Sequence, residues 1–226
     1  MPERIALVGG TGPEGRGLAA RFALAGHEVT LGSRDATRAA DAAGELTERL
    51  AAAGSTTRVR GAANAEAVAD CDVAVIVVPY EAHRTTLESL ATPLAGKVVV
   101  DAVVPVRFER GPRPVEVPEG SATEQAAAIL PDSHVIGAFH NLAAEALLDL
   151  ERPLDADVLV TGGDAEAKAL VSALAEQIEG VRAVDAGPLR FSRFVEGLTV
   201  LLIGINGRYK AHSAPRIVGL PERTAS

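Results

Sequence analysis

Residues 8–15 read Val-Gly-Gly-Thr-Gly-Pro-Glu-Gly, directly after the apolar run Ile5-Ala6-Leu7 and before an apolar helical pattern at residues 18–24. This order predicts a strand, a glycine turn and a helix. Gly10, Gly12 and Gly15 have the G-x-G-x-x-G spacing of dinucleotide sites, which serves a tight turn, a close approach to a pyrophosphate, and packing of the helix on the strand. The helix start would offer free N–H groups to the phosphates. The same spacing also fits an ordinary glycine-rich turn, so the surrounding sequence has to decide.

The composition favours one main domain and argues against several kinds of partner. The chain has 226 residues, of which 47% are hydrophobic, enough for one sizeable core. Its formal net charge is −8 and it has no lysine-arginine tract, so we expect no binding to nucleic acid or to an anionic membrane. Cys71 is the single cysteine, and no charged leader with a long apolar segment opens the sequence. We therefore expect a cytoplasmic protein.

The most apolar stretch, residues 198–205, is far shorter than the roughly 18 residues that a membrane-spanning helix needs. Together with Phe194 and Val195 its apolar residues have helical spacing. This pattern predicts a long, buried helix after Gly187-Pro188.

Predicted strands and helices alternate along the chain. Residues 73–78 form a continuous, mostly β-branched run, which is typical of a strand buried on both faces. Shorter apolar runs predict further strands at residues 27–31, 57–60, 97–100, 134–139, 158–160 and 181–185. The pattern predicts an α/β protein with a Rossmann-type, doubly wound and mainly parallel sheet, and with a small C-terminal helical part.

One segment interrupts this alternation. Residues 105–118 contain four prolines and three arginines, too many fixed φ angles and missing donors for a helix or a central strand. We expect a long surface loop. Such a loop is either a solvated connection or the cover of a site.

In a doubly wound sheet, ligands bind outside the carboxyl ends of the strands. The glycine turn lies at this edge, and four more segments follow predicted strands there: Ser33-Arg34, Val78-Pro79-Tyr80, Val103-Val104-Pro105 and His140-Asn141. The end of the second strand indicates the nucleotide, because NAD sites usually have an acid there for the ribose. This chain has Ser33, Arg34 and Arg38 instead, which favours NADP. Two alternatives stay open: the arginines only face solvent, or Asp35 turns toward the ribose and favours NAD.

Five segments together resemble the NADPH-dependent deazaflavin coenzyme reductases, the 8-hydroxy-5-deazaflavin:NADPH oxidoreductases. They are residues 9–12, 32–34, 78–81, 103–106 and 185–189, and the resemblance extends over about residues 5–208. It is specific because it combines the first turn with Ser33-Arg34 and with a late run containing Ser192, Arg193 and Glu196. The resemblance implies a Rossmann domain, a homodimer, and hydride transfer between NADP(H) and the deazaflavin coenzyme F420.

The resemblance also implies roles for individual residues. Residues 11–14 would line the pyrophosphate, Ser33, Arg34 and Arg38 would hold the 2′-phosphate, and the two rings would lie beyond them. The implied contacts are Thr11, Gly12, Pro13 and Glu14 for the pyrophosphate; Val78, Pro79 and Ala144 for the nicotinamide half; and Val104, Pro105, His140, Asn141, Leu142 and Ala143 for the deazaflavin.

These expectations divide the chain into three parts. Residues 1–150 would form the NADP-binding Rossmann core. Residues 151–210 would be a C-terminal α/β extension of the same domain, on the dimer and deazaflavin side. Residues 211–226 have no periodicity and no counterpart in the family, so we expect a tail.

Direct hydride exchange between two cofactors requires the protein mainly to hold the reactive carbons close together and dry. The sequence accordingly has no G-x-S-x-G, no H-E-x-x-H and no cysteine-histidine cluster, and we predict no catalytic side chain and no metal. One alternative is an NADP-dependent reductase of a small imine or ketone, which would need a proton donor such as His140, Tyr80 or Asn141. Another is a non-catalytic NADP(H)-binding module, which an apolar partner-binding surface would favour.

Overall fold

The first glycine turn joins the central strand β1 (Arg4–Val8) to helix α1 (Pro13–Leu24), as the sequence predicts. The computed structural model describes residues 2–220. In this part the chain continues through β2 (Glu28–Ser33), α2 (Ala36–Ala52), β3 (Arg60–Ala63), α3 (Asn64–Ala69), β4 (Val73–Ile76), α4 (Tyr80–Leu94) and β5 (Val98–Asp101). It then forms β6 (Val106–Phe108), β7 (Pro112–Pro114), α5 (Ala122–Ile129), β8 (His134–Gly137), α6 (Ala144–Leu148), β9 (Ala156–Gly162), α7 (Ala165–Glu176), β10 (Val181–Gly187), the 3-10 turn Leu189–Phe191 and α8 (Ser192–Tyr209).

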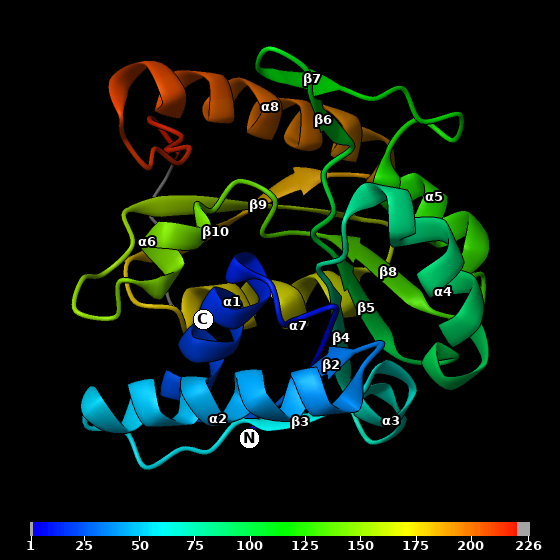
Figure 1. Ribbon diagram of the computed structural model, residues 1–226. Helices are drawn as coiled ribbons and strands as arrows, with labels where there is room; N and C mark the ends of the chain where they lie inside the picture. Colours follow the sequence, from blue (N-terminus) through cyan, green and yellow to red (C-terminus); the bar gives the residue numbers. More distant parts are fainter. Residues whose placement is uncertain (1, 221–226) are drawn as a thin grey trace.

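Eight of these strands form one sheet, in the order β10-β9-β8-β5-β4-β1-β2-β3 (Figure 1). The six strands from β8 to β3 are mutually parallel. Strand β9 pairs antiparallel with β8, and β10 runs parallel to β9. The prediction of a Rossmann-type, mainly parallel sheet is confirmed. Strands β9 and β10 add to one edge of this sheet and run antiparallel to the other six strands.

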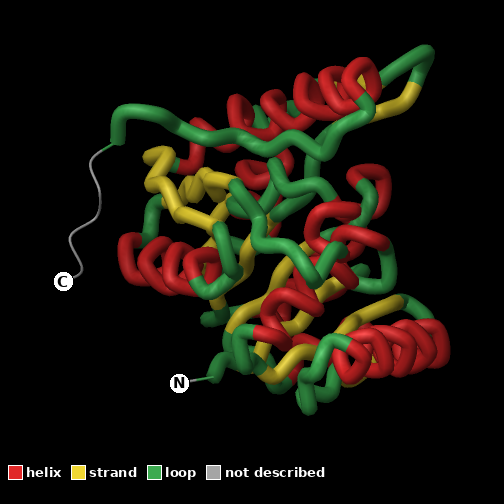
Figure 2. The backbone as a smooth tube through the Cα atoms, turned by 90° about the vertical axis from the view of Figure 1, so that its left-hand side faces the viewer, coloured by secondary structure: helices red, strands yellow, loops and turns green. Residues whose placement is uncertain are grey.

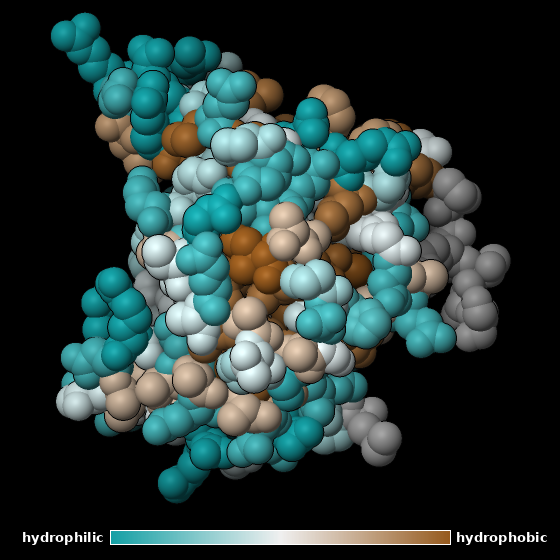
Figure 3. Space-filling view, turned by 90° about the vertical axis from the view of Figure 1, so that its right-hand side faces the viewer, coloured by the Kyte–Doolittle hydropathy of each residue, from teal (hydrophilic) through white to brown (hydrophobic). Residues whose placement is uncertain are grey.

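Helices cover both faces of the sheet because its central strands are apolar on both sides. In β1, Ile5 and Leu7 face the core beneath α1, α2 and α7, whereas Ala6 and Val8 face the core beneath α3, α4 and α5. All four residues of β4 are fully buried, as the β-branched run predicts. Hydrophobic residues also gather in the middle of the face at the right-hand side of Figure 1, with polar residues above and below them (Figure 3).

The third strand lies later in the chain than the prediction of residues 57–60. Strand β3 (Arg60–Ala63) pairs with β2 from Thr30 to Ser33. A Cβ atom at Gly61 would lie 2.2 Å from the carbonyl oxygen of Ala39 in α2, so only glycine fits where this helix crosses the strand. This close approach fixes the register of the edge strand.

The predicted surface loop at residues 105–118 contains a two-stranded hairpin, β6 and β7, which packs against α8. Val106 pairs with Pro114 and Phe108 with Pro112, around a turn in which Arg110 and Gly111 have positive φ angles of 51° and 126°. Proline is tolerated because a two-stranded ribbon leaves one edge of each strand unpaired. The sequence predicts only a long surface loop here, and this two-stranded hairpin within it was not predicted.

The long C-terminal helix is present, but the prediction that it is buried is wrong. On α8, Val195 and Leu202 face the interior, whereas the side chains of Phe194 and Leu201 are 68% and 60% exposed. The apolar spacing of the sequence therefore belongs to two faces of one helix, only one of which the described chain covers.

The predicted tail is docked where the structure describes it. Its first residues run back across the molecule beside α8 (Figure 2). Fully buried Asp157 in β9 accepts hydrogen bonds from Arg182 and from the backbone N–H of Ile217, and its own N–H donates to the carbonyl of Pro215 over 2.8 Å. Burial opposes ionisation of Asp157, but these donors outweigh it and hold its pKa below the usual range. The remainder of the predicted tail, residues 221–226, lies outside the described residues.

Candidate cofactor site

A cavity of about 1130 Å³ opens at the carboxyl ends of the parallel strands. Its size exceeds the roughly 300–1,000 Å³ that is usual for a single ligand. It brings together most of the predicted site residues: Thr11, Gly12, Pro13, Glu14, Ser33, Arg34, Arg38, Val78, Pro79, Val104, His140, Asn141, Leu142, Ala143 and Ala144.

Gly10 and Pro105 are the predicted residues that do not line this cavity. A Cβ at Gly10 would lie 2.6 Å from the Cβ of Leu7, so this glycine packs inside the turn. Pro105 is buried, and its carbonyl accepts a hydrogen bond from Val115 at the base of the hairpin. Both residues lie behind the cavity wall and support the residues that line it.

The glycine turn has the geometry of a phosphate cradle. A Cβ at Gly15 would lie 2.5 Å from the Cα of Gly10, so helix and turn touch through their backbones. At Gly12, which precedes the first turn of α1, a Cβ would meet no atom within 4 Å, so the backbone is open to a ligand. Gly9, with a φ of 75°, makes the sharp bend and lines the cavity, a role that the motif spacing alone did not assign.

Glu14 adds a carboxyl group to this cradle. Its Oε1 atom is buried and has no hydrogen-bond partner among the described residues. Burial raises the pKa of Glu14 to about 8, so the group is mostly protonated at neutral pH. A neutral carboxyl group can donate a hydrogen bond to an anion instead of repelling it.

The end of β2 presents cations to the cavity. Arg34 and Arg38 line it with exposed side chains, and neither guanidinium group has an ion-pair or hydrogen-bond partner within residues 2–220. Asp35, the competing acid, caps α2 instead: its Oδ1 accepts from the backbone N–H groups of Thr37 and Arg38, at 2.9 and 3.2 Å. The hydroxyl of Ser33 accepts from the N–H of Asp35. This corner therefore favours an anionic group over a ribose diol.

At the inner end, side chains of α8 hold the chain after β8. Asn141 donates to the carbonyl of Val195 over 2.9 Å and to the hydroxyl of Thr199 over 2.7 Å, and Thr199 donates to the carbonyl of His140. The sequence analysis missed that α8 and the segment after it line the cavity with Thr199, Leu202, Ile203, Asn206, Ala211, His212 and Ser213. Their helical spacing predicted burial but could not reveal a cavity on that side.

His140 lines the same inner end with a ring that is 2% exposed. Its Nδ1 atom has no hydrogen-bond partner in the described part of the chain. Burial lowers the pKa of His140 to about 4, so the ring is neutral at physiological pH.

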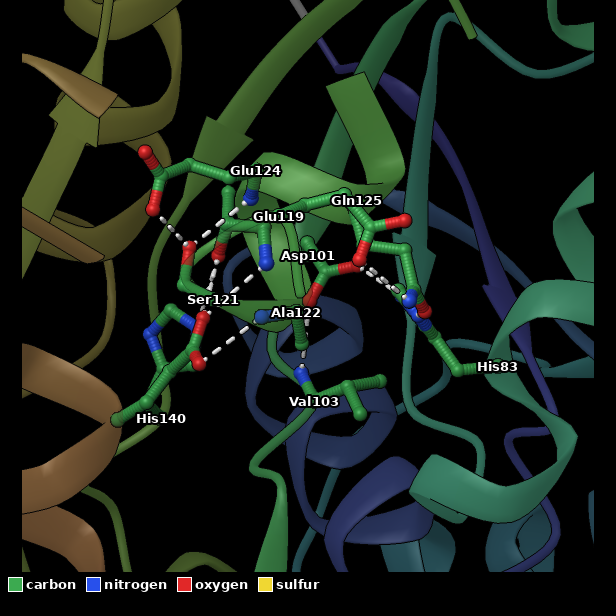
Figure 4. Close-up of polar contacts among 11 residues, drawn as sticks. His83, Asp101, Val103, Glu119, Ser121, Ala122, Glu124, Gln125 and His140 are labelled. Carbon is green, nitrogen blue, oxygen red and sulfur yellow. Dashed lines mark hydrogen bonds and ion pairs between the residues drawn. The ribbon is translucent and has the colours of Figure 1, made fainter. Parts of the chain in front are cut away.

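A second buried pair supports the wall at residues 101–104 (Figure 4). His83 Nε2 lies 2.6 Å from Oδ2 of Asp101, and Asp101 Oδ1 accepts from the backbone N–H of Val103. Burial opposes protonation of His83, but the charge and the hydrogen bond of Asp101, with a further hydrogen bond that Gln125 Oε1 accepts from Nδ1, outweigh it and raise the pKa of His83. The pair fixes the turn that carries Val104 into the cavity.

Two kinds of feature are absent from residues 2–220. None of their helices combines the length and the hydropathy that crossing a bilayer requires. They also contain no group of three His, Cys, Asp or Glu side chains arranged to hold a metal ion.

Comparison with known proteins agrees with a site for NADP in this cavity. Residues 4–105 match the family model described as NADP oxidoreductase coenzyme F420-dependent. The F420-dependent NADP reductase of Methanothermobacter marburgensis is 44% identical over 225 residues, which cover 97% of this chain and 100% of that protein. The chain belongs to the coenzyme F420-dependent NADP oxidoreductase family.

Solved structures agree with this membership. A crystal structure of an Arthrobacter sp. FB24 protein, described as an F420-dependent NADP reductase, superimposes with a TM-score of 0.77 at 29% identity and covers 94% of this chain and 97% of that one. An imine reductase from Bacillus cereus has a TM-score of 0.59 at 18% identity, covering 91% of this chain and 62% of its own, and shows a shared fold alone.

The glycine cradle yields a prediction that separates folding from binding. Gly12→Ala leaves the melting temperature unchanged but weakens NADPH binding at least tenfold, because its methyl group occupies space that is open in the cradle. Gly15→Ala lowers the stability by about 1–3 kcal/mol, because its methyl group overlaps the backbone of Gly10. Thermal melting and NADPH titration measure the two effects.

Gly44→Ala is the matched control, because Gly44 is an exposed residue of α2 outside this cavity. This variant should lower neither the melting temperature nor the affinity for NADPH. Wild-type NADPH affinity in Gly12→Ala would show that the phosphates do not approach this turn.

Proposed function

We propose that this enzyme transfers a hydride reversibly between NADP(H) and the deazaflavin coenzyme F420. The observation that carries the proposal is one continuous cavity with unpaired cations at one end and, at the other, apolar side chains beside His140 and Asn141. Its volume of about 1130 Å³ suits a dinucleotide together with a second ring system. The family membership and the name of the M. marburgensis relative support the same pair of substrates.

The nucleotide fits the first end of the cavity. Gly12 and the N-terminus of α1 would hold the pyrophosphate, and Ser33, Arg34 and Arg38 the 2′-phosphate. Val78, Pro79 and Ala144 would border the nicotinamide half. This arrangement is the one that the sequence predicts for NADP.

The deazaflavin fits the inner end. Val104, Leu142 and Ala143 provide apolar surface, and His140 and Asn141 are held in place by α8. The nicotinamide and the deazaflavin supply the redox chemistry, in which a hydride passes directly from one ring carbon to the other. The side chains around them bind the rings, orient them and exclude water, and none has to transfer a proton.

One observation bears on the alternative of an imine or ketone reductase. That reaction needs a proton donor beside the acceptor carbon, but His140, the histidine at this end of the cavity, is neutral near pH 7. The imine reductase structure shares less than a fifth of its residues with this chain. The geometry therefore supports hydride transfer between two cofactors better.

The proposed activity predicts fast oxidation of NADPH with an 8-hydroxy-5-deazaflavin and slow oxidation with FMN, FAD or a cyclic imine, because the wall at the inner end supplies ring contacts and its histidine, His140, is neutral. Absorbance at the NADPH and deazaflavin bands measures all four reactions. Turnover of the imine without turnover of the deazaflavin would reverse the assignment, and binding of NADPH with no turnover of any acceptor would favour a non-catalytic binding module.

Arg34 yields a prediction about the nucleotide. Hydrogen bonds to charged groups contribute roughly 1.5–3 kcal/mol, so Arg34→Ala should weaken NADPH binding by about ten- to a hundredfold and leave NADH binding nearly unchanged. Titrations at two salt concentrations measure it, since salt screens an exposed pair. Arg58→Ala removes an equal charge outside this cavity and serves as the control. Equal losses for NADPH and NADH would show that this corner does not bind the 2′-phosphate.

We further propose a homodimer formed through α8. Its outer face carries Phe194 and Leu201, with half-buried Leu198 and Ile205 on the same helical stripe. A two-fold interface would bury this stripe against its copy. The family resemblance supports the same state.

Light scattering tests the dimer. Leu201→Glu should convert a dimer to a monomer, because a buried interface does not accommodate an unpaired carboxylate. Leu24→Glu changes a 41% exposed leucine on α1 and should leave the dimer intact. A monomeric wild-type protein at micromolar concentration would contradict the proposal.

Cytoplasmic localisation also remains part of the proposal. The lone Cys71 is buried, and burial raises the pKa of its thiol, which keeps it protonated and unreactive. A protein without an internal disulfide suits a reducing compartment.

A further inference from the structure

Two buried side chains behind His140 have no part in the function described so far. Thr123, in the first turn of α5, is fully buried, and Glu196 of α8 is 4% exposed. The hydroxyl of Thr123 lies 3.5 Å from Nε2 of His140 and 3.0 Å from Oε1 of Glu196. These groups form a chain from the cavity wall to α8, at the point where α5 begins.

The protons in this chain can be placed by counting donors. Glu196 accepts from the backbone N–H groups of Ala122 and Thr123, at 3.0 and 3.1 Å, and from the Thr123 hydroxyl. Three donors converge on one carboxyl group, so its ionised form satisfies all of them. The hydroxyl group of Thr123 has a single proton, which it donates to Glu196. The hydroxyl oxygen of Thr123 can then only accept a further hydrogen bond.

A group that donates to this oxygen has to carry a proton. Nε2 of His140 is the atom that faces it, so in the neutral ring the proton lies on Nε2 and Nδ1 has a lone pair. Nδ1 has no partner among the described residues, although His140 lines the cavity.

We propose that Thr123 and Glu196 are positioning residues that hold His140 in its Nε2–H tautomer, so that the cavity wall offers a hydrogen-bond acceptor at Nδ1. The ligand group recognised there is then an N–H or O–H donor on a ring edge, and a ring with only acceptors at that edge is disfavoured because it leaves the lone pair unpaired. The inference rests on the proposed function in one respect, the assignment of that ring to the deazaflavin.

The surroundings of Glu196 set the conditions for a test. Burial, with a smaller contribution from the negative charge of Asp101, raises its pKa to about 7, although the hydrogen bonds from the N–H groups of Ala122 and Thr123 lower it. At pH 8 the carboxyl group is therefore mostly ionised. His140, with a pKa lowered to about 4, is neutral at the same pH.

The test is ¹⁵N NMR of the imidazole nitrogens in protein labelled at histidine, recorded at pH 8 without ligand. The signals of His140 are assigned by their loss in His140→Gln. The wild type should show Nε2 protonated and Nδ1 unprotonated. Thr123→Ser, which keeps the hydroxyl, should retain this tautomer, whereas Thr123→Val, which keeps the shape, should give a mixture of tautomers.

Steady-state kinetics provide the functional half of the test. Thr123→Val should raise the KM for the deazaflavin by about two- to tenfold, the equivalent of one ordinary hydrogen bond, with the KM for NADPH unchanged. Thr123→Ser should restore the wild-type value. Glu124→Gln alters a neighbouring carboxylate of the same helix turn, which pairs with Arg193, and should leave the tautomer of His140 unchanged.

Two results would overturn the inference. A wild-type His140 protonated at Nδ1, or doubly protonated at pH 8, refutes it whether or not any variant folds. Thr123→Val with an unchanged tautomer and unchanged KM also refutes it. Absence of deazaflavin turnover in the wild type would instead remove the proposed function, since the NMR result does not depend on that ligand.

Discussion

The close contact between Gly15 and the backbone of Gly10 is the constraint on which the rest of the site depends. A side chain at Gly15 would push α1 away from β1, because its Cβ would overlap backbone atoms of Gly10, which have no flexible group to move. With α1 held there, its N-terminus and the open backbone of Gly12 face the ends of the parallel strands. The positive end of the helix dipole and the unpaired Arg34 and Arg38 then act on the same region. An anionic ligand is thereby accommodated by a chain whose formal net charge is −8.

The second half of the site depends on α8, which comes from the other end of the sequence. Polar side chains on its inner face hold two other segments: Thr199 bonds to Asn141 in the chain after β8, and Glu196 bonds to the start of α5. These bonds are buried or partly buried, so their polar atoms need their partners, and the helix cannot rotate without leaving several of them unpaired. The apolar outer face of α8 is then fixed in the orientation that we propose for the dimer.

The parts of the fold that follow local rules could be predicted from the sequence. The strand, turn and helix at residues 4–24 follow from apolar runs and glycine spacing, and the buried strand β4 follows from its β-branched residues. The direction of β9 could not be predicted, because an apolar run has the same pattern in either direction. The exposed face of α8 looks like a buried face, because apolar periodicity does not say which neighbour covers it. The docked segment after α8 is held by backbone and charged groups around Asp157, which leave no periodic signal.

The site was predictable to a similar extent. Residues at the ends of the parallel strands could be placed because the carboxyl ends of such strands meet at one edge. Gly9 was missed because its positive φ is a property of the turn and not of the motif spacing. Thr123 and Glu196 could not be connected to His140, since they act across three elements that are distant in sequence.

The central claim is that one cavity holds both rings and that the hydride passes directly between them. The most direct measurement is a single turnover with NADPH deuterated at both C4 positions, in ordinary water, with the reduced deazaflavin analysed by mass spectrometry and NMR. Direct transfer predicts one deuterium on the deazaflavin carbon for each NADPH oxidised. Protium at that carbon would contradict the account, because it would show that the hydrogen exchanges with solvent on the way.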